Sequence, residues 1–258
     1  MQKAPEIRTV DIIRYVTPLR EGGSLPAIVE GDDSFLYVLK FRGAGQGIKA
    51  LIAELIGGEM ARALGLKVPE IVFATVDPAF GRTEPDEEIQ DLLKASAGLN
   101  LATHYLSGAI TFDPAVNKVD VITASKIVWL DSLITNVDRT VRNTNMLMWH
   151  KELWVIDHGA SLYFHHALDN WEESSKRTFA KVKDHVLLPY ATALNEVNKE
   201  ALGMITPERI EGILSIVPDE WLTMAFGDAV NGRSIYQQYL QNRLSITDLL
   251  IKEATNAH

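Results

Sequence analysis

The start of the chain alternates or clusters β-branched and aromatic residues in short runs, as partly buried strands do. Turn-forming residues separate the runs, with REGGS after the first and GDDS after the second. The pattern predicts an antiparallel meander of three strands. The runs are RTVDIIRYV (8–16), LPAIVEG (25–31) and SFLYVLKF (34–41).

A helical period follows the three strand-like runs. The segment IKALIAELIGGEMARALGL (48–66) places apolar residues at near-helical spacing, is rich in Ala and Glu, and is ended by VPE. Gly57 and Gly58 weaken the middle of this predicted helix. Beyond it, the pattern predicts a strand at 71–77, a short helix near 89–97 and a strand at 100–106.

Beyond Ser107 the pattern becomes mainly helical. An amphipathic helix is predicted at 118–134, and a polar run and a β pair at 145–149 and 152–156 follow it. The sequence therefore predicts an α+β protein with a β-rich part over 1–107 and a mainly helical part over 108–258. The later segments with helical periodicity are 179–194, 207–217, 219–230 and 234–254.

The composition is that of an ordinary globular protein. The chain has 258 residues, of which 47% are hydrophobic and 23% charged, so it can bury a substantial core. The absence of cysteine excludes disulfides, zinc–thiolate sites and thiol nucleophiles, and it suits a reducing compartment. No apolar run approaches the roughly 18 residues of a membrane span. We therefore expect a soluble, cytoplasmic protein.

The net charge of −9 disfavours binding to a nucleic-acid backbone, which requires clustered Lys and Arg. No nucleic-acid partner is expected. A small phosphorylated ligand remains compatible with an acidic protein, because a bound metal ion can hold an anion locally.

Four features occur in the order that phosphoryl transfer requires. The first three are a glycine turn at Gly22 and Gly23, Lys40 inside a predicted strand, and Glu54 in the following helix. The fourth is the polar run NVDRTVRNTNML (136–147) with the trailing WVIDHG (154–159). The template places a glycine loop over the phosphates, pairs a strand lysine with a helix glutamate, and ends with a catalytic loop and a metal-binding Asp.

The spacing within the fourth feature matches the catalytic loop of the template. Four residues separate Asp138 from Asn143, and Asp157 ends a predicted strand, with Gly159 able to turn the chain. Mg²⁺ prefers a few oxygen ligands plus substrate phosphates, which Asn143 and Asp157 can complement.

These motifs resemble the HipA-like kinases, which share a fold plan with protein kinases and phosphatidylinositol kinases. YVLKF resembles the lysine strand of that family, and AELIGGEMARALGLKVPE resembles its glutamate helix. EEIQDLLKASAGLNLATHYL resembles the segment that leads to the interlobe hinge, while DRTVRN and IDHG are the most specific motifs. The resemblance implies a two-lobed kinase-like fold, with an N-lobe over 1–107 and a C-lobe over 108–258.

The resemblance also implies an ATP- and Mg²⁺-dependent phosphotransferase. Asp138 would orient or deprotonate the acceptor hydroxyl, and Asn143 and Asp157 would hold Mg²⁺. Lys40 would contact the ATP phosphates with Glu54 as its partner. The expected acceptor is a protein Ser or Thr, and a small-molecule or lipid acceptor is the alternative.

Several neighbouring residues have less definite assignments. The hinge strand, ending near Tyr105 to Gly108, would bound the adenine pocket. Arg139 and Arg142 could steady the loop, touch phosphate or be merely structural. Asn145 is a second candidate metal ligand, but its spacing from Asp138 makes it the second choice.

Other functions fit the sequence less well. GAGQG (43–47) lacks the third glycine of a dinucleotide-binding fingerprint, and no G-x-S-x-G marks a serine hydrolase. A metal hydrolase could recruit His158, His165 and His166, but they lack an H-x-x-x-H spacing. A kinase-fold module that binds nucleotide without transferring phosphate stays open, although such a module has no need of Asp138.

Overall fold

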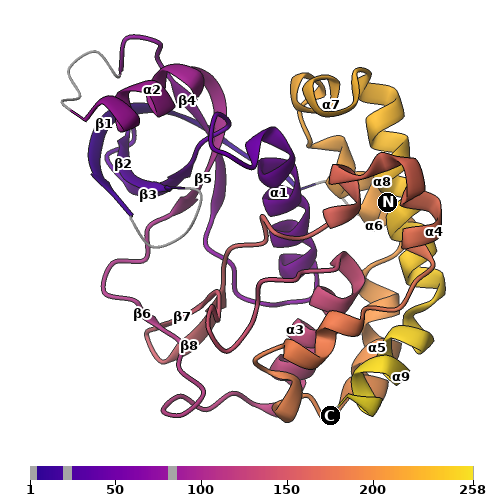
Figure 1. The fold of residues 1–258 in the computed structure, drawn as a ribbon. Helices are drawn as coiled ribbons and strands as arrows, with labels where there is room; N and C mark the ends of the chain where they lie inside the picture. Colours follow the sequence, from indigo (N-terminus) through magenta and orange to yellow (C-terminus); the bar gives the residue numbers. More distant parts are fainter. Residues whose placement is uncertain (1–4, 20–24, 81–85, 258) are drawn as a thin grey trace.

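A computed structural model describes residues 5–19, 25–80 and 86–257 of the chain. Five strands close into a barrel in the order β1-β2-β3-β5-β4 (Figure 1). The predicted meander is confirmed, because β1 pairs antiparallel with β2, and β2 with β3. A parallel pairing of β4 with β1 completes the barrel. The strands are β1 (Thr9–Pro18), β2 (Ala27–Gly31), β3 (Leu36–Lys40), β4 (Ile71–Val76) and β5 (Gly98–His104).

The alternation of side chains in β3 decides where Lys40 lies. Tyr37 and Leu39 are fully buried and belong to the apolar cluster of the barrel. Because neighbouring side chains of a strand point to opposite faces, Lys40 lies on the other face of β3 from Leu39. That face meets helix α1 (Gly47–Ala63), where Lys40 bonds to Glu54.

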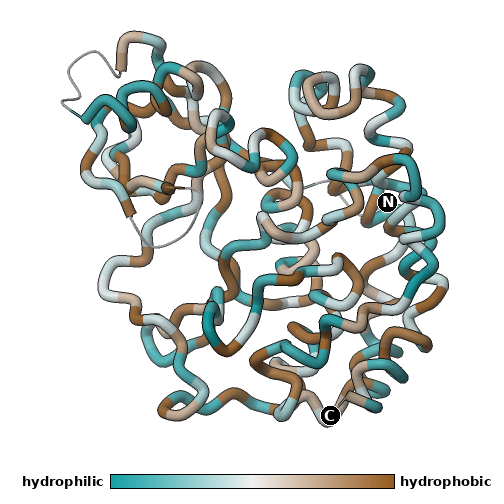
Figure 2. Tube along the Cα trace, viewed as in Figure 1, coloured by the Kyte–Doolittle hydropathy of each residue, from teal (hydrophilic) through white to brown (hydrophobic). Residues whose placement is uncertain are grey.

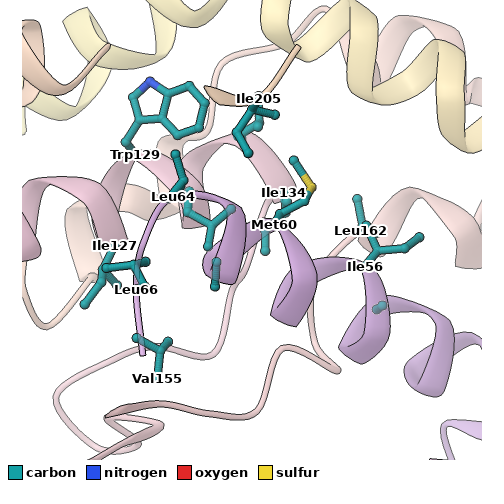
Figure 3. Close-up of a cluster of buried hydrophobic side chains, with 14 of the residues drawn as sticks. Ile56, Met60, Leu64, Leu66, Ile127, Trp129, Ile134, Val155, Leu162 and Ile205 are labelled. Carbon is teal, nitrogen blue, oxygen red and sulfur yellow. The ribbon is translucent and has the colours of Figure 1, made fainter. Parts of the chain in front are cut away.

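Helix α1 is buried along most of its length, because it lies between the barrel and the helices that follow (Figure 1). Its residues Ile56 and Met60 belong to the same hydrophobic cluster as Ile127 and Ile134 of α3 (Val121–Ile134), shown in Figure 3. The predicted helix is confirmed, but it ends at Ala63 rather than at residue 66.

The end of α1 has a clear physical cause. Gly65 has a left-handed backbone with φ +77°, which ends a helix at little cost in a residue without Cβ. Leu66 N donates to Ala61 O, and Gly65 N donates to Arg62 O. These two bonds form a Schellman motif, which satisfies carbonyls that the helix end would leave free.

The remaining elements surround the C-terminal side of α1. A small sheet has the order β6-β7-β8, and helices pack around α3. Figure 2 shows hydrophobic and hydrophilic residues interspersed along these helices, as expected where one face is buried. The elements are α2 (Glu87–Ala95), β6 (Ile110–Thr111), β7 (Met146–Trp149), β8 (Glu152–Val155), α4 (Trp171–Ser175), α5 (Leu194–Met204), α6 (Pro207–Ser215), α7 (Asp219–Phe226), α8 (Ala229–Ser245) and α9 (Thr247–Asn256).

Several predicted helices differ from the observed ones. The segment 179–194 forms two short 3₁₀ helices, Ala180–Asp184 and Leu188–Tyr190, and Pro189 cannot supply the backbone donor of a continuous helix. The segment 219–230 ends at Phe226, because Gly227 is left-handed and the Asp228 side chain caps α8. The segment 234–254 is divided at Ile246, and α5 was not predicted.

The lengths of the helices bear on the question of a membrane span. Within residues 5–19, 25–80 and 86–257, we find no helix that combines the length and the apolar character needed to traverse a bilayer.

Candidate active site

Three of the predicted residues meet where β3, α1 and the end of β8 come together. Lys40 Nζ donates to Glu54 Oε2 at 2.7 Å and to Asp157 Oδ1 at 2.6 Å. The Lys40 and Glu54 side chains are 16% and 3% exposed, whereas that of Asp157 is 46% exposed. One buried ammonium group is therefore shared by a buried carboxylate and an accessible one.

The charges of this cluster depend on one another. Burial by itself would lower the pKa of Lys40, but Asp157 and Glu54 outweigh it and raise that pKa. The Lys40 charge lowers the pKa of Asp157, and burial raises the pKa of Glu54 despite the same lysine. The charged forms of Lys40 and Asp157 therefore favour each other.

A close approach between α1 and the chain after β8 holds the cluster in place. His158 N donates to Glu54 Oε2 at 2.7 Å, so the backbone after Asp157 is tied to α1. A Cβ on Gly57 would lie only 2.6 Å from His158 Cβ, closer than folded proteins allow. Gly57, which weakens the helix by propensity, is therefore required by packing at this contact.

The loop after α3 forms the second half of the site. Asp138 Oδ2 accepts hydrogen bonds from Asn143 Nδ2 at 2.8 Å and from Asn145 Nδ2 at 3.3 Å. The Asn136 side chain accepts a bond from Asp138 N at 3.1 Å. Thr140 N donates to Asn143 O, which closes the loop into a tight turn. Asp138 and Asn143, which four residues separate in the sequence, are therefore joined by a direct side-chain hydrogen bond.

Asn145 is positioned more firmly than Asn143. It is 8% exposed, directly precedes β7 and has a left-handed backbone with φ 48°, while Asn143 is exposed. Its carbonyl accepts a hydrogen bond from Ile156 N at 3.0 Å, so it pairs with the residue before Asp157. Asp157 is itself left-handed, with φ 57°. The β7–β8 pair therefore delivers Asn145 and Asp157 to the same place.

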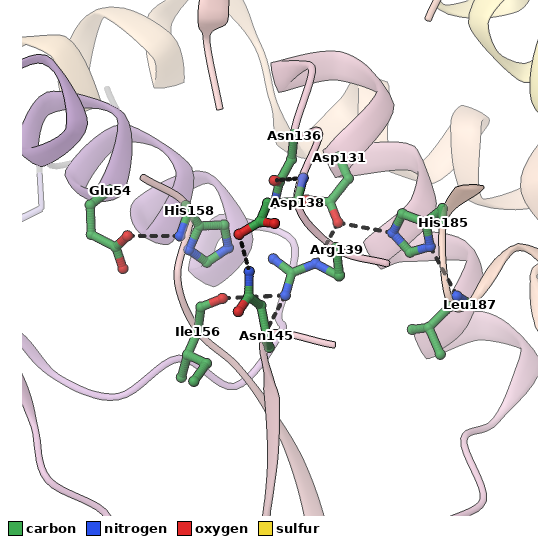
Figure 4. Close-up of polar contacts among 10 residues, drawn as sticks. All are labelled: Glu54, Asp131, Asn136, Asp138, Arg139, Asn145, Ile156, His158, His185 and Leu187. Carbon is green, nitrogen blue, oxygen red and sulfur yellow. Dashed lines mark hydrogen bonds and ion pairs between the residues drawn. The ribbon is translucent and has the colours of Figure 1, made fainter. Parts of the chain in front are cut away.

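Arg139 links the parts of this arrangement through the polar contacts drawn in Figure 4. It is 1% exposed, and its Nε donates to Asp131 Oδ2 at 2.5 Å. Its Nη1 donates to the carbonyls of Asn145 and Ile156, the latter at 3.2 Å. Arg139 thereby joins α3 to the chain segments that carry Asn145 and Asp157. Of the two arginines left open by the sequence, it is the one that steadies the loop.

Asp131 in α3 is the buried anchor of that arginine. It also accepts from Asn136 Nδ2 at 3.1 Å and pairs with His185 Nε2 at 3.0 Å. His185 Nδ1 accepts from Leu187 N, so the ring proton lies on Nε2 and is donated to Asp131. Burial alone would raise the pKa of Asp131, but Arg139 and His185 hold it well below its usual range.

Sequence reasoning missed this anchor, although one signal was present. The predicted helix at 118–134 contains WLDSLI, in which Asp131 is a single carboxylate among large apolar residues. Such a group is rarely buried without a charged partner. Arg139 is a candidate loop residue in the sequence, but hydrophobic periodicity does not indicate that its side chain contacts Asp131.

The other predicted residues lie at the margin of the described site. Tyr105 follows β5, is half-buried, and donates its backbone N to Leu36 O, which holds the predicted hinge against the start of β3. Arg142 is exposed. Gly22 and Gly23 lie outside the described residues, so the predicted glycine loop stays a prediction.

The alternative sites of the sequence gain no support. The GAGQG segment follows β3, which pairs antiparallel with β2 and with β5, unlike the parallel strand of a dinucleotide fold. Among the described residues, no three His, Asp or Glu side chains are grouped to hold a metal ion. His165, proposed for a hydrolase, instead bonds to Tyr236 and His166.

Comparison with known proteins gives a family and a fold. The family model described as HipA-like kinase matches residues 12–247. Among solved structures, the chain is similar to the proinflammatory kinase CtkA of Helicobacter pylori, with a TM-score of 0.57 and 13% identity over 98% of both chains. The Golgi casein kinase with Mn/ADP bound has a TM-score of 0.49 and 12% identity, over 97% of this chain and 74% of that chain. No curated protein matches.

These comparisons bear on the predicted fold class. At 13% identity, the likeness to CtkA concerns the fold alone, and it agrees with the expected α+β arrangement shared with kinases. The family match runs from within β1 to the end of α8, so it includes most of the barrel and most of the helices after α3.

The buried anchor leads to a prediction about stability. Arg139→Ala leaves Asp131 charged and buried without its main partner, so the free energy of unfolding should fall by about 3 to 5 kcal/mol. Arg177→Ala is the matched control, because its ion pair with Glu173 is exposed and should be worth at most about 0.5 kcal/mol. Urea unfolding of both variants measures the difference. Equal losses in the two variants would contradict the anchoring role.

Proposed function

The chain belongs to the HipA-like kinase family, and from this premise we propose that it transfers the γ-phosphate of ATP to a hydroxyl acceptor in the presence of Mg²⁺. The supporting observation is the contact of Lys40 with both Glu54 and Asp157. Phosphoryl transfer uses a lysine–glutamate pair next to a metal-binding aspartate, because positioning and charge stabilisation supply most of its catalysis.

The proposal assigns the nucleotide to the region between the barrel and the helical part, the two lobes of the expected fold. Lys40 would hold the phosphates, with Glu54 fixing its side chain. Tyr105 would border the adenine, and Gly22 and Gly23 would cover the phosphates. These roles follow the order of elements in the kinase template.

Asp138 would act on the acceptor. Its Oδ2 is held by Asn143 and Asn145, and this leaves Oδ1 without a hydrogen bond to the described residues. In the proposed step the acceptor oxygen forms a bond to the γ-phosphorus, and the bond from that phosphorus to the β–γ bridging oxygen breaks. ADP leaves, and Asp138 accepts the hydroxyl proton.

The oxygen donors of the site suit Mg²⁺. Asp157 offers a partly exposed carboxylate whose Oδ2 has no hydrogen bond to the described residues, and Asn145 offers an amide oxygen on the chain segment paired with it. Mg²⁺ prefers such oxygen ligands together with water and phosphate. When bound, it would neutralise charge on the phosphates.

Position favours Asn145 over Asn143 as the second ligand. Asn145 is paired through its backbone with the residue before Asp157, and Arg139 fixes its carbonyl. Both asparagines donate to Asp138 Oδ2, but Asn143 lies on the exposed turn. We therefore propose Asn145 and Asp157 as the metal-binding pair, which reverses the order of preference given by spacing alone.

Two alternatives remain within the same fold. A kinase-fold module could bind nucleotide without transfer, and a small molecule or a lipid could replace a protein Ser or Thr as acceptor. The carboxylate of Asp138, oriented by two amides, favours the enzyme over the binding module, because nucleotide binding does not require it.

The first test is Mg-ATP turnover by the wild type and by Asp138→Ala, measured with radiolabelled ATP and a cell extract. We expect Asp138→Ala to bind ATP and to transfer phosphate at least about 10²-fold more slowly, since it loses the acceptor-orienting base. Asp157→Ala should abolish labelling. If the wild type binds ATP and neither labels an acceptor nor hydrolyses ATP, the non-catalytic alternative is correct.

The second test compares Asn145→Ala with Asn143→Ala at varied Mg²⁺ concentration. We expect Asn145→Ala to raise the Mg²⁺ concentration for half-maximal activity by about tenfold or more, because it removes a metal ligand. Asn143→Ala is the matched control, and its Mg²⁺ requirement should stay close to that of the wild type. The opposite ranking would return the ligand role to Asn143.

A further inference from the structure

An open groove of about 1090 Å³ borders the loop that carries Asp138. Residues between 137 and 142 of this loop line it together with residues between 181 and 189. Sites for small ligands usually enclose about 300 to 1000 Å³ and bury most of the ligand. Because this groove is open and would leave a small ligand largely exposed, it suits a segment of polypeptide better than a metabolite.

The groove is attached to the catalytic loop by backbone contacts. Thr140 forms a β-bridge with His185, and Val186 N donates to Arg139 O at 3.1 Å. His185 is in turn held by Asp131, the anchor of Arg139. The walls of the groove and the position of Asp138 are thus fixed by the same buried network.

Positive charge is concentrated in this groove. Arg142, Lys181 and Lys183 line it, all three are exposed, and none has an ion pair with a described residue. The accompanying carboxylate in the lining is Asp184. Three cations against one anion contrast with the net charge of −9 for the whole chain. Charge complementarity therefore calls for an acidic ligand.

Exposed apolar side chains lie among these cations. Val137, Val141 and Tyr163 line the groove and are 40%, 73% and 61% exposed. Exposed apolar surface next to a polar rim is typical of a binding site for protein. A nucleic acid also carries negative charge, but it offers little for these side chains and would meet the acidic remainder of the protein.

We propose that the groove binds the acceptor as a polypeptide segment in which acidic residues and an apolar residue flank the hydroxyl-bearing residue. Acidic side chains pair with Arg142, Lys181 and Lys183, and the apolar one packs on Val137, Val141 and Tyr163. The inference rests on the proposed function and adds to it the substrate class. Binding of the segment places its hydroxyl at the loop that carries Asp138.

The experiment measures peptide binding without ATP, by fluorescence anisotropy. The probe is a labelled peptide with one serine between glutamates and leucines, and its partner has glutamine in place of each glutamate. The protein variants are Lys181→Glu combined with Lys183→Glu, and Lys199→Glu as the control, an exposed lysine of α5 that does not line the groove. Arg142→Glu repeats the test in a single exposed residue, should the double variant fail to fold.

We expect the wild type and Lys199→Glu to bind the acidic peptide about tenfold more tightly than the glutamine peptide. The groove variants should lose this preference, and added salt should weaken it in the wild type because exposed charges are screened. Equal binding of the two peptides would overturn the inference. Tighter binding of a single-stranded DNA oligonucleotide than of the acidic peptide would also overturn it.

Phosphate transfer to the two peptides separates this inference from the proposed function. Preferential labelling of the acidic peptide, expressed as a KM about tenfold lower with similar kcat, supports both. If both peptides are labelled with equal KM, the proposed preference for acidic peptides is wrong, while the proposed kinase activity is supported. If the acidic peptide binds in a manner that depends on Lys181 and Lys183, but ATP is not turned over, the groove is supported as a peptide-binding site. The proposed kinase function is then contradicted.

Discussion

The buried ion pair between Asp131 and Arg139 is the interaction on which the candidate site depends. Desolvating two charges costs free energy, and only good geometry with further hydrogen bonds offsets that cost. Asp131 has three side-chain partners, and Arg139 also donates to two backbone carbonyls. These bonds offset much of the cost, although Nη2 of Arg139 is buried without a partner among the described residues. Those carbonyls belong to Asn145 and Ile156, so a fully buried ion pair sets the positions of backbone groups next to the candidate site.

A second set of contacts connects the barrel to the segments that Arg139 holds in place. Lys40 leaves β3 on its outer face, and Glu54 of α1 receives it there. The same Glu54 oxygen binds the backbone of His158, which Gly57 allows to approach α1. The cluster therefore depends on three separate segments, each placed by its own local rule: strand alternation, helix packing and a backbone turn. A site with parts on separate segments is suited to holding a ligand between them.

The sequence predicted most elements of this fold, because each depends on a local period. The strands at 8–16, 25–31 and 34–41 and the helix after residue 48 were visible in this way. Closure of the barrel was not, since pairing between distant strands leaves no period in either one. The segment 179–194 has a helical period, but it forms two short 3₁₀ helices, and Pro189 lacks the backbone donor of a continuous helix.

Within the candidate site, the order of Lys40, Glu54, Asp138 and Asp157 was readable because a known chemistry requires it. The proposed preference for Asn145 over Asn143 has no counterpart in the sequence pattern, because it is argued from how β7 pairs with β8. The most direct measurement is a crystal structure with Mg²⁺ and a non-hydrolysable ATP analogue. It should place the phosphates beside Lys40 Nζ and the metal on Asp157 and Asn145. A nucleotide bound away from Lys40, or a metal that does not touch Asp157, would contradict the account.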